Sequence, residues 1–407
     1  AGEQAMKWKH DNAGGGINKL VLVVNESCNL YCGYCYVRHS PHKCMSGKMD
    51  PLLARQIVQR FFTTNNSCNF VQFFGGEPTL NLAAIEAAIK ETNRLVDNAR
   101  LGKKPRFGIV TNGIFRDSDK VIDFFKRHNI EATVSLDGPA IIHDELRCEK
   151  SGKPTFDRVY KTISELIKIK VPVAIETVYT ALHIEKNVSI IDIFKFCRET
   201  KIAKLIFDIA YPPAPKKFNP LFDPYFNTLV TYYEEAVDWW LKSLIENNTM
   251  ALDVYFRELL RPLIDGLPAA VAKGGCPAGE SDFAVGPKGD IFVCQLLYGN
   301  PGYKIGNVRS DDVSFLKPEF PRGSDDIRAC RQCLIRHWCQ PCAALNLSWG
   351  NPWQPPRREC QLRKAVIFRL GAWAFSHLDV PENEITSDLR KTVEKRCAVG
   401  HNPTVTL

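Results

Sequence analysis

Residues 20–35 read LVLVVNESCNLYCGYC, an aliphatic run followed at once by three closely spaced cysteines. The run 20–24 predicts a short buried strand, because it is apolar and rich in β-branched residues. The cysteines follow in the next loop with the spacing CxxxCxxC, at Cys28, Cys32 and Cys35. Three thiolates so close together can ligate three irons of a 4Fe–4S cluster and leave the fourth iron open to another ligand.

A zinc knuckle is the main alternative for this group of cysteines. Zinc sites favour paired CxxC groups with a fourth Cys or His ligand, and His39 and Cys44 are the nearest candidates. The chain has 15 cysteines and no apolar signal segment, which favours metal ligation over a disulfide framework. Five cysteines stand alone and are expected to be structural thiols: Cys44, Cys68, Cys148, Cys197 and Cys397.

The first half of the chain alternates short β-branched runs with amphipathic helical stretches, which is typical of βα units and a parallel sheet. Six strands are expected, at 20–24, 71–74, 107–110, 132–136, 173–179 and 205–209. Asp50 and Pro51 are expected to begin a helix that ends at Phe62. Six units predict an α/β fold with a partial (β/α)6 TIM-like barrel, whose chemistry would lie in the loops after the strands.

Composition divides the chain into five expected parts. These are a flexible arm at 1–16, the barrel at 17–225, a helical linker at 226–270, a small Cys-rich domain at 271–365 and a helical segment with a tail at 366–407. The proline-rich stretch 211–224 ends the barrel, and helices are expected at 231–246 and 252–264. From Lys273 onward Gly, Pro and Cys become frequent, as in a domain held by metal rather than by a large core.

The second predicted strand ends in Gly75-Gly76-Glu77-Pro78, one βα unit after the three cysteines. Together with Tyr34, just before the third cysteine, this pattern resembles the radical S-adenosylmethionine (SAM) superfamily. The resemblance implies an enzyme, an oxidoreductase that cleaves SAM to a 5′-deoxyadenosyl radical. It also implies that Tyr34 packs near the adenosyl part of the cofactor. The glycines would let the backbone approach a ligand, and the carboxylate and carbonyls of the turn would accept hydrogen bonds from the SAM ammonium.

Three further SAM contacts are implied at the ends of the third and fourth strands. By the resemblance, Asn112 would contact the ribose, and Ser135 and Arg147 the methionine carboxylate. Arg158 competes with Arg147 for this role. A salt bridge on a helix surface is the alternative for either arginine.

The carboxy-terminal cysteines resemble the SPASM extension of radical SAM enzymes, which holds two auxiliary 4Fe–4S clusters. By that resemblance the outer cluster would be bound by Cys330, Cys333, Cys339 and Cys360. The inner one would be bound by Cys276, Cys294 and Cys342. Three 4Fe–4S clusters are therefore expected in all. A zinc-bearing domain is the alternative, since CxxC pairs are common zinc ligands.

Two departures from the SPASM pattern affect the inner cluster. Only Gln340 and Pro341 separate Cys339 from Cys342, where the family usually has three residues. A fourth thiolate is also missing, so either Asp282 ligates the cluster or the site stays open to a substrate thiolate. Asp282 as an ordinary loop residue is the third possibility.

SPASM-bearing enzymes mostly act on peptide or protein side chains, so we expect a maturase that forms a thioether or carbon–carbon crosslink in a ribosomally made peptide. Sulfatase maturases, which make formylglycine, resemble the chain in Asp137-Gly138-Pro139. They typically use an Asp base directly after the cysteine equivalent to Cys294. Here that residue is Gln295, which takes no proton at neutral pH, and no catalytic base is assigned. A non-catalytic electron carrier or scaffold is a further alternative, but it would not need the GGEP turn.

Charge and hydropathy narrow the expected partners. The net charge is +8, but the basic residues are scattered, which disfavours nucleic-acid binding. No stretch approaches the roughly 18 apolar residues of a membrane span, so a soluble, cytoplasmic protein is expected. The family resemblance implies that it works anaerobically. Its partners would be a precursor peptide or protein substrate and an electron donor such as flavodoxin or ferredoxin. Too few residues precede Leu20 for a winged-helix leader-binding module. A leader would then bind the barrel rim, residues after Leu362 or a separate protein.

Overall fold

The computed structural model describes residues 16–42, 46–200, 204–247, 254–266, 275–310, 318–382, 386–387, 389–391 and 394. The chain forms two compact units. Unit 1 comprises residues 1–136, 143–174 and 277–319, and unit 2 comprises residues 137–142, 175–276 and 320–407. The expected arm before Gly16, Cys44 and Cys397 lie outside the described residues.

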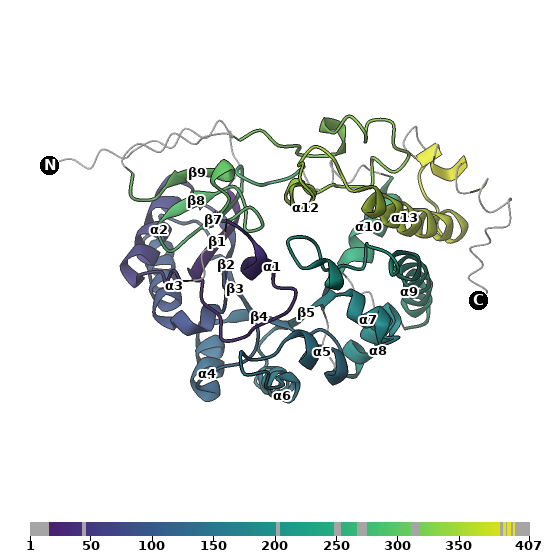
Figure 1. Ribbon diagram of the computed structural model, residues 1–407. Coiled ribbons are helices and arrows are strands. Elements are labelled where there is room, and N and C mark those ends of the chain that lie inside the picture. The colour runs from purple at the N-terminus through teal and green to yellow at the C-terminus, as the bar shows by residue number, and fades with distance from the viewer. Residues whose placement is uncertain are drawn as a thin grey trace. The chain divides into compact units, whose positions relative to one another are not determined.

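Unit 1 is built on a mostly parallel sheet (Figure 1). Its parallel strands are β1 (Ile17–Asn25), β2 (Cys68–Gly75), β3 (Arg106–Thr111), β4 (Ile130–Ser135) and β7 (Asp282–Val285). The antiparallel strands β8 (Asp290–Phe292) and β9 (Lys304–Asn307) continue it beyond β7, in the order β4-β3-β2-β1-β7-β8-β9. Leu20 of β1 pairs with Val71 on one side and Phe283 on the other. All three side chains are buried, so β1 is the centre of the core.

The helices of unit 1 follow its strands. They are α1 (Tyr36–His39), α2 (Pro51–Thr64), α3 (Leu82–Asp97), α4 (Ser118–His128) and α6 (Phe156–Lys168), with short 3-10 turns η1 (Pro78–Asn81) and η3 (Pro301–Tyr303). As predicted, Asp50 caps α2, its carboxylate accepting from the Leu52 N–H at 2.7 Å, and Pro51 is the first helical residue. The Phe61 ring of α2 lies 5.5 Å from that of Phe283, so α2 covers β7.

Unit 2 contains the parallel strands β5 (Val173–Tyr179) and β6 (Leu205–Ile209), although β5 begins in unit 1. Its helices are α7 (Ala181–Glu185), α8 (Ile190–Glu199), α9 (Phe226–Asn247), α10 (Val254–Asp265), α12 (Ala343–Ser348) and α13 (Arg357–His377), and its 3-10 turns are η2 (Lys216–Phe218) and η4 (Ser324–Asp326). The chain crosses from unit 2 to unit 1 within α5 (Ala140–Leu146). Helix α13 packs on α9 and α10 (Figure 1). Phe256 is fully buried among Phe194, Tyr233 and Trp240.

The six predicted parallel strands are all present, with some boundaries extended by a few residues. The strands β7, β8 and β9 follow Lys273, and β7 pairs directly with β1, a pairing that the sequence did not predict. Cys68 and Cys197 are buried as expected of structural thiols, whereas Cys148 is half-buried. Within the described ranges, no helix is long and apolar enough to cross a membrane.

Candidate functional site

Cys28, Cys32 and Cys35 lie in the loop after β1, half-buried and in no disulfide. The loop is held from the side by residues 146–148. The Tyr31 N–H donates to the Cys148 carbonyl at 2.7 Å, and the Gly33 N–H donates to the Leu146 carbonyl at 2.9 Å. These bonds tie the backbone between the cysteines to residues 146–148.

The Cys28 sulfur accepts two hydrogen bonds, from the Leu30 N–H at 3.4 Å and from Asn112 Nδ2 at 3.5 Å. Burial, together with the nearby charge of Glu77, still raises the pKa of the Cys28 thiol to about 11. A thiolate here therefore needs a cation to compensate its charge, and iron meets this need. The surroundings of Cys28 fit a cluster ligand.

The GGEP turn after β2 packs against the backbone of the cysteine loop. The Gly76 N–H donates to the Asn25 carbonyl at 2.8 Å, and the Glu77 N–H donates to the Ser27 carbonyl at 2.9 Å. Gly75 has φ +144°, and a Cβ there would lie 2.0 Å from the Asn25 oxygen. A Cβ on Gly76 would lie 2.4 Å from the Ser27 oxygen. Because they lack a Cβ, both glycines can lie against the backbone of residues 25–27, and the approach of a ligand to this turn stays a prediction.

Glu77 is fully buried, and its carboxylate joins the turn to the end of β3. Oε1 accepts from the Thr79 N–H at 3.0 Å, the Thr79 hydroxyl at 2.6 Å and the Thr111 hydroxyl at 2.8 Å. Oε2 accepts from the Asn112 N–H at 2.8 Å. Burial raises the pKa of this carboxyl, although each of these donors opposes the shift. The carboxylate is thus already fully bonded by the protein, and its contact with the SAM ammonium stays a prediction.

Asn112 is also bonded within the site. Its Nδ2 donates to Asn29 Oδ1 at 2.8 Å, besides Cys28, and its Oδ1 accepts from the Ile114 N–H at 2.9 Å. Asn29 completes a ring of bonds by donating to the Ile114 carbonyl at 2.7 Å. We had not identified Asn29 from the sequence; the available signal was an amide placed between two cysteines. The predicted ribose contact of Asn112 stays a prediction.

Tyr34 and Arg147 lie together beside the cysteine loop. Both are buried, and the Arg147 guanidinium carbon is 5.3 Å from the centroid of the Tyr34 ring. Arg158 instead forms a partly exposed ion pair with Glu149, the alternative considered for both arginines. Ser135 is buried at the end of β4. Of the two arginines, Arg147 is therefore the one positioned beside the cysteine loop.

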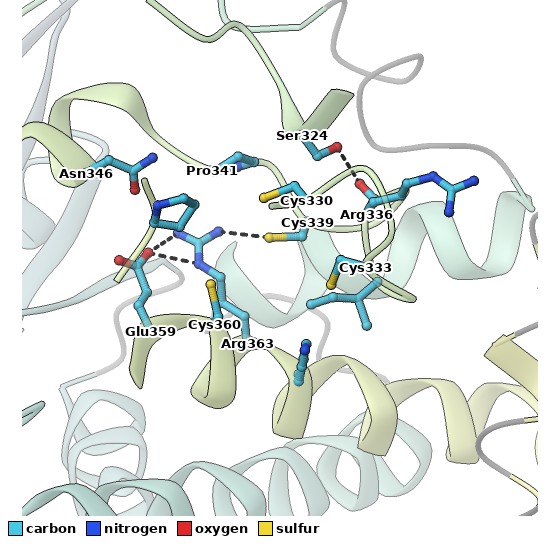
Figure 2. Close-up of a pocket in the computed structure, with 13 residues that line it drawn as sticks. Ser324, Cys330, Cys333, Arg336, Cys339, Pro341, Asn346, Glu359, Cys360 and Arg363 are labelled. Atoms are coloured by element: carbon cyan, nitrogen blue, oxygen red, sulfur yellow. Dashed lines mark hydrogen bonds and ion pairs between the residues drawn. The ribbon is translucent and has the colours of Figure 1, made fainter. Parts of the chain in front are cut away.

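A second group of thiols lines one cavity in unit 2 (Figure 2). It consists of Cys330, Cys333, Cys339 and Cys360, the four assigned to the outer cluster. Burial and the neighbouring thiols raise the pKa of Cys330 and of Cys360 to about 11. The first three come from a segment of turns and the fourth from α13, so residues 30 positions apart in the sequence meet here because α13 packs against this segment.

The predicted inner ligands are divided between the units. Cys342 precedes α12, and burial raises its pKa, a shift to which the nearby Cys276 thiol adds. Cys276 is held by Arg322: its N–H donates to the Arg322 carbonyl at 2.9 Å, and Arg322 Nη1 donates back to the Cys276 carbonyl at 3.0 Å. Cys294 belongs to unit 1, just after β8. An inner cluster bound by all three cysteines stays a prediction.

Asp282 is the first residue of β7 rather than a loop residue. Its Oδ1 accepts from Asn18 Nδ2 at 2.7 Å, and its Oδ2 forms an ion pair with Lys19 at 3.7 Å. The carboxylate would have to leave both partners to bind iron. Its role as an iron ligand stays a prediction.

Gln295 follows Cys294, and its Oε1 is buried without a hydrogen-bond partner among the described residues. Nearby in the chain, the Tyr298 hydroxyl donates to Glu26 Oε1 at 2.5 Å, which ties the β8–β9 connection to the cysteine loop of β1. Across the described ranges, no three His, Cys, Asp or Glu side chains converge closely enough to hold a single metal ion. A 4Fe–4S cluster places each thiolate on a different iron, so its ligands need not converge on one point.

A family model described as the radical SAM superfamily matches residues 22–197. A cysteine-type anaerobic sulfatase-maturating enzyme of Clostridium novyi is 28% identical over 74% of this chain and 79% of its own length. An uncharacterized protein of Methanocaldococcus jannaschii is 30% identical over 79% of this chain and 98% of its own.

Two solved structures share the fold. Native anSMEcpe with bound AdoMet and Cp18Cys peptide has a TM-score of 0.70 at 21% identity, covering 94% of this chain and 100% of that one. Streptococcus suis SuiB bound to the precursor peptide SuiA has a TM-score of 0.57 at 17% identity, covering 83% of this chain and 74% of that one. These likenesses confirm the predicted α/β fold with a partial barrel.

Proposed function

The chain belongs to the radical SAM superfamily, and we propose that it is a peptide maturase that forms a thioether or carbon–carbon crosslink in a ribosomally made peptide. It is related to the anaerobic sulfatase maturases and to peptide-modifying enzymes. The observation that carries the crosslinking proposal is Gln295. An amide stands directly after Cys294, where the maturases would place a base.

The residues of unit 1 support SAM cleavage. Cys28, Cys32 and Cys35 would hold a 4Fe–4S cluster, and Tyr34, Ser135 and Arg147 would position SAM beside it. Arg147 supplies a buried positive charge suited to a carboxylate, and the buried Ser135 hydroxyl would donate to the same group. When bound, SAM and the cluster supply a radical that takes a hydrogen atom from the substrate. The buried side chains around the loop exclude water from that radical.

The second cysteine group supports the redox balance of a crosslink. Joining a thiol sulfur to a carbon breaks one S–H and one C–H bond and forms one C–S bond. One hydrogen atom leaves with the deoxyadenosyl group, the thiol proton goes to solvent, and one electron needs an acceptor. An auxiliary iron–sulfur cluster in the unit 2 cavity would be that acceptor.

Gln295 disfavours formylglycine synthesis, because that reaction needs a base beside the substrate side chain. The Gln295 amide oxygen is a weak acceptor that remains neutral at physiological pH. This oxygen is buried and no described residue donates to it, so it is suited to accept a hydrogen bond from a substrate N–H or O–H. Sulfatase maturation remains the second candidate function, since the similarity to the Clostridium novyi maturase extends over most of both chains.

Mass spectrometry of the modified peptide separates the two functions. The reconstituted protein, with SAM and dithionite, is incubated either with the Cp18Cys peptide or with each short cysteine-containing peptide found encoded near its gene. Loss of two hydrogen atoms from the neighbouring peptide, with its sulfur retained, is the expected result. Conversion of the cysteine in Cp18Cys to formylglycine, in which an oxygen replaces the sulfur and two hydrogen atoms are lost, would assign the chain to the maturases instead. SAM cleavage without change in either peptide would contradict a function on ribosomal peptides encoded nearby.

The variant Gln295→Asp sharpens this test, because it restores the maturase residue. If the missing base is what separates the two reactions, the variant gains formylglycine formation on Cp18Cys and loses crosslinking. The matched control is Gln56→Asp, which adds the same charge at an exposed position of α2. Equal behaviour of the two variants would show that Gln295 does not determine the reaction.

A further inference from the structure

The cavity that collects four cysteines also holds an ion pair, between residues one turn apart on α13. Arg363 donates to Glu359 Oε1 through Nε at 2.9 Å and through Nη2 at 2.6 Å. The two side chains are only 16% and 5% exposed. Glu359 Oε2 is buried with no hydrogen-bond partner among the described residues, so this carboxylate depends on Arg363.

The remaining nitrogen of Arg363 points toward the cysteine segment (Figure 2). Nη1 lies 3.9 Å from Cys339 Sγ and donates to the Gln340 carbonyl at 3.2 Å. Gln340 belongs to the shortened spacer between Cys339 and Cys342. One side chain therefore fixes the spacer to the helix that carries Cys360.

Arg363 and Glu359 line the same cavity as the four thiols. Of the two charged groups, the Arg363 guanidinium is the one that contacts a thiol, through Nη1 and Cys339 Sγ.

We propose that Arg363 is a positioning residue for a cluster bound by Cys330, Cys333, Cys339 and Cys360, and that its contact with the Cys339 sulfur raises the reduction potential of that cluster. This inference rests on the proposed function, because it requires a cluster in this cavity. Reduction adds negative charge to a cluster, and a buried cation with an N–H beside one sulfur stabilises the added charge. Arg363 would make this cluster a better acceptor for the electron released on crosslinking.

The test is a redox titration of the reconstituted full-length protein, followed by electron paramagnetic resonance. In Arg363→Gln, we expect the ratio of reduced to oxidised auxiliary cluster at a fixed potential to fall about tenfold. For a one-electron couple this equals a shift of about 59 mV to more negative potential. The matched control is Arg369→Gln, which breaks another α13 ion pair, with Asp238. It should leave every cluster potential unchanged.

An unchanged potential in Arg363→Gln, with the iron content of the wild type, would overturn the proposal. If Arg363→Gln loses the cluster, two milder variants test whether the charge of Arg363 sets the cluster potential. Arg363→Lys keeps the charge without the planar guanidinium group, and should shift the potential less. Glu359→Gln removes the negative end, and should shift it in the opposite direction. No shift in either variant would also overturn the proposal.

The iron content distinguishes a failure of the proposal about Arg363 from a failure of the proposed function. A variant with Ser in place of Cys330, Cys333, Cys339 and Cys360 should lose one cluster's iron. Full iron retention in that variant would mean that the cavity holds no cluster. The proposed electron acceptor would then be wrong, and Arg363 would have no cluster to act on.

Discussion

The two cysteine groups are held in different ways. The loop with Cys28 is bonded through its backbone to the GGEP turn, at the ends of two parallel strands. The segment with Cys330 is a series of turns whose backbone bonds are local, such as Cys339 N–H to the Ile335 carbonyl at 2.9 Å. A loop on a sheet takes its shape from the strands, whereas a segment of turns takes much of its shape from what it binds. We therefore expect the loop with Cys28 to keep its structure without metal, and the segment with Cys330 to depend on metal for its structure.

Replacing Cys28, Cys32 and Cys35 together by Ala is expected to have the largest effect, and only on chemistry. SAM cleavage should be abolished, because no cluster remains to deliver an electron. Iron should fall by about a third if three 4Fe–4S clusters are bound. Assays of 5′-deoxyadenosine and iron measure both effects, with circular dichroism to check that the fold is kept. Loss of the fold would contradict the view that the sheet shapes this loop.

Replacing Cys330, Cys333, Cys339 and Cys360 together by Ser should damage the structure instead. Residues 320–342 should become sensitive to limited proteolysis, since their turns lose the group that joins them. Residues 17–135 should stay protected, which serves as the internal control. Equal protection of 320–342 in the variant and the wild type would show that this segment, like the first, is shaped by the protein alone.

His183 provides an acid-sensitive position in unit 2 that is independent of the cysteines. Its Nδ1 accepts from the Thr180 N–H at 3.1 Å, so Nε2 donates to the Asp137 carbonyl at 3.0 Å. Burial lowers the pKa of His183 to about 4, below the ~6.5 of an unfolded chain. The unfolded state binds its proton first, so stability should fall as pH drops from ~6.5 to 4, by up to ~3 kcal/mol.

Urea unfolding at several pH values, for wild type and His183→Gln, measures this effect. The difference between the two proteins removes contributions from the clusters and other carboxyls. It should shrink as the pH falls through that window, because the wild type loses the advantage of its neutral imidazole. A difference that is constant with pH would contradict the buried neutral state.

Glu77→Gln is expected to have a smaller effect, centred on unit 1. An amide NH2 would replace one carboxylate oxygen and face a donor, either the Asn112 N–H or the two threonines. This should cost about 2 kcal/mol of unfolding free energy, as for other unsatisfied buried groups. Glu86→Gln is the matched control. Glu86 lies on the solvent-facing side of α3, where its ion pair with Lys90 should contribute under ~1 kcal/mol to the free energy of unfolding. Similar midpoints in thermal unfolding for the two variants would show that the Glu77 network adds little.

The strands and the cysteine motifs could be predicted because their signals are local. Apolar runs such as 20–24 predict strands wherever the chain later goes, and CxxxCxxC limits the three thiols to one short loop. The assignment of Cys330, Cys333, Cys339 and Cys360 to one group came from family resemblance, and the structure brings these four together. Composition alone would not have paired Cys360 with a segment that ends 18 residues earlier.

The rest could not be predicted because it depends on contacts between distant residues. Nothing in the sequence shows that β7 pairs with β1, some 260 residues away, or that Asp282 is bonded to Asn18. The same holds for the glycines of the GGEP turn, whose need for a missing Cβ is set by the Asn25 and Ser27 carbonyls. Local patterns by themselves determined which chemistry the chain carries. Only the tertiary structure decided which groups are already bonded and which are available to a ligand, because a hydrogen-bond partner is chosen by position in space and not by order in the chain.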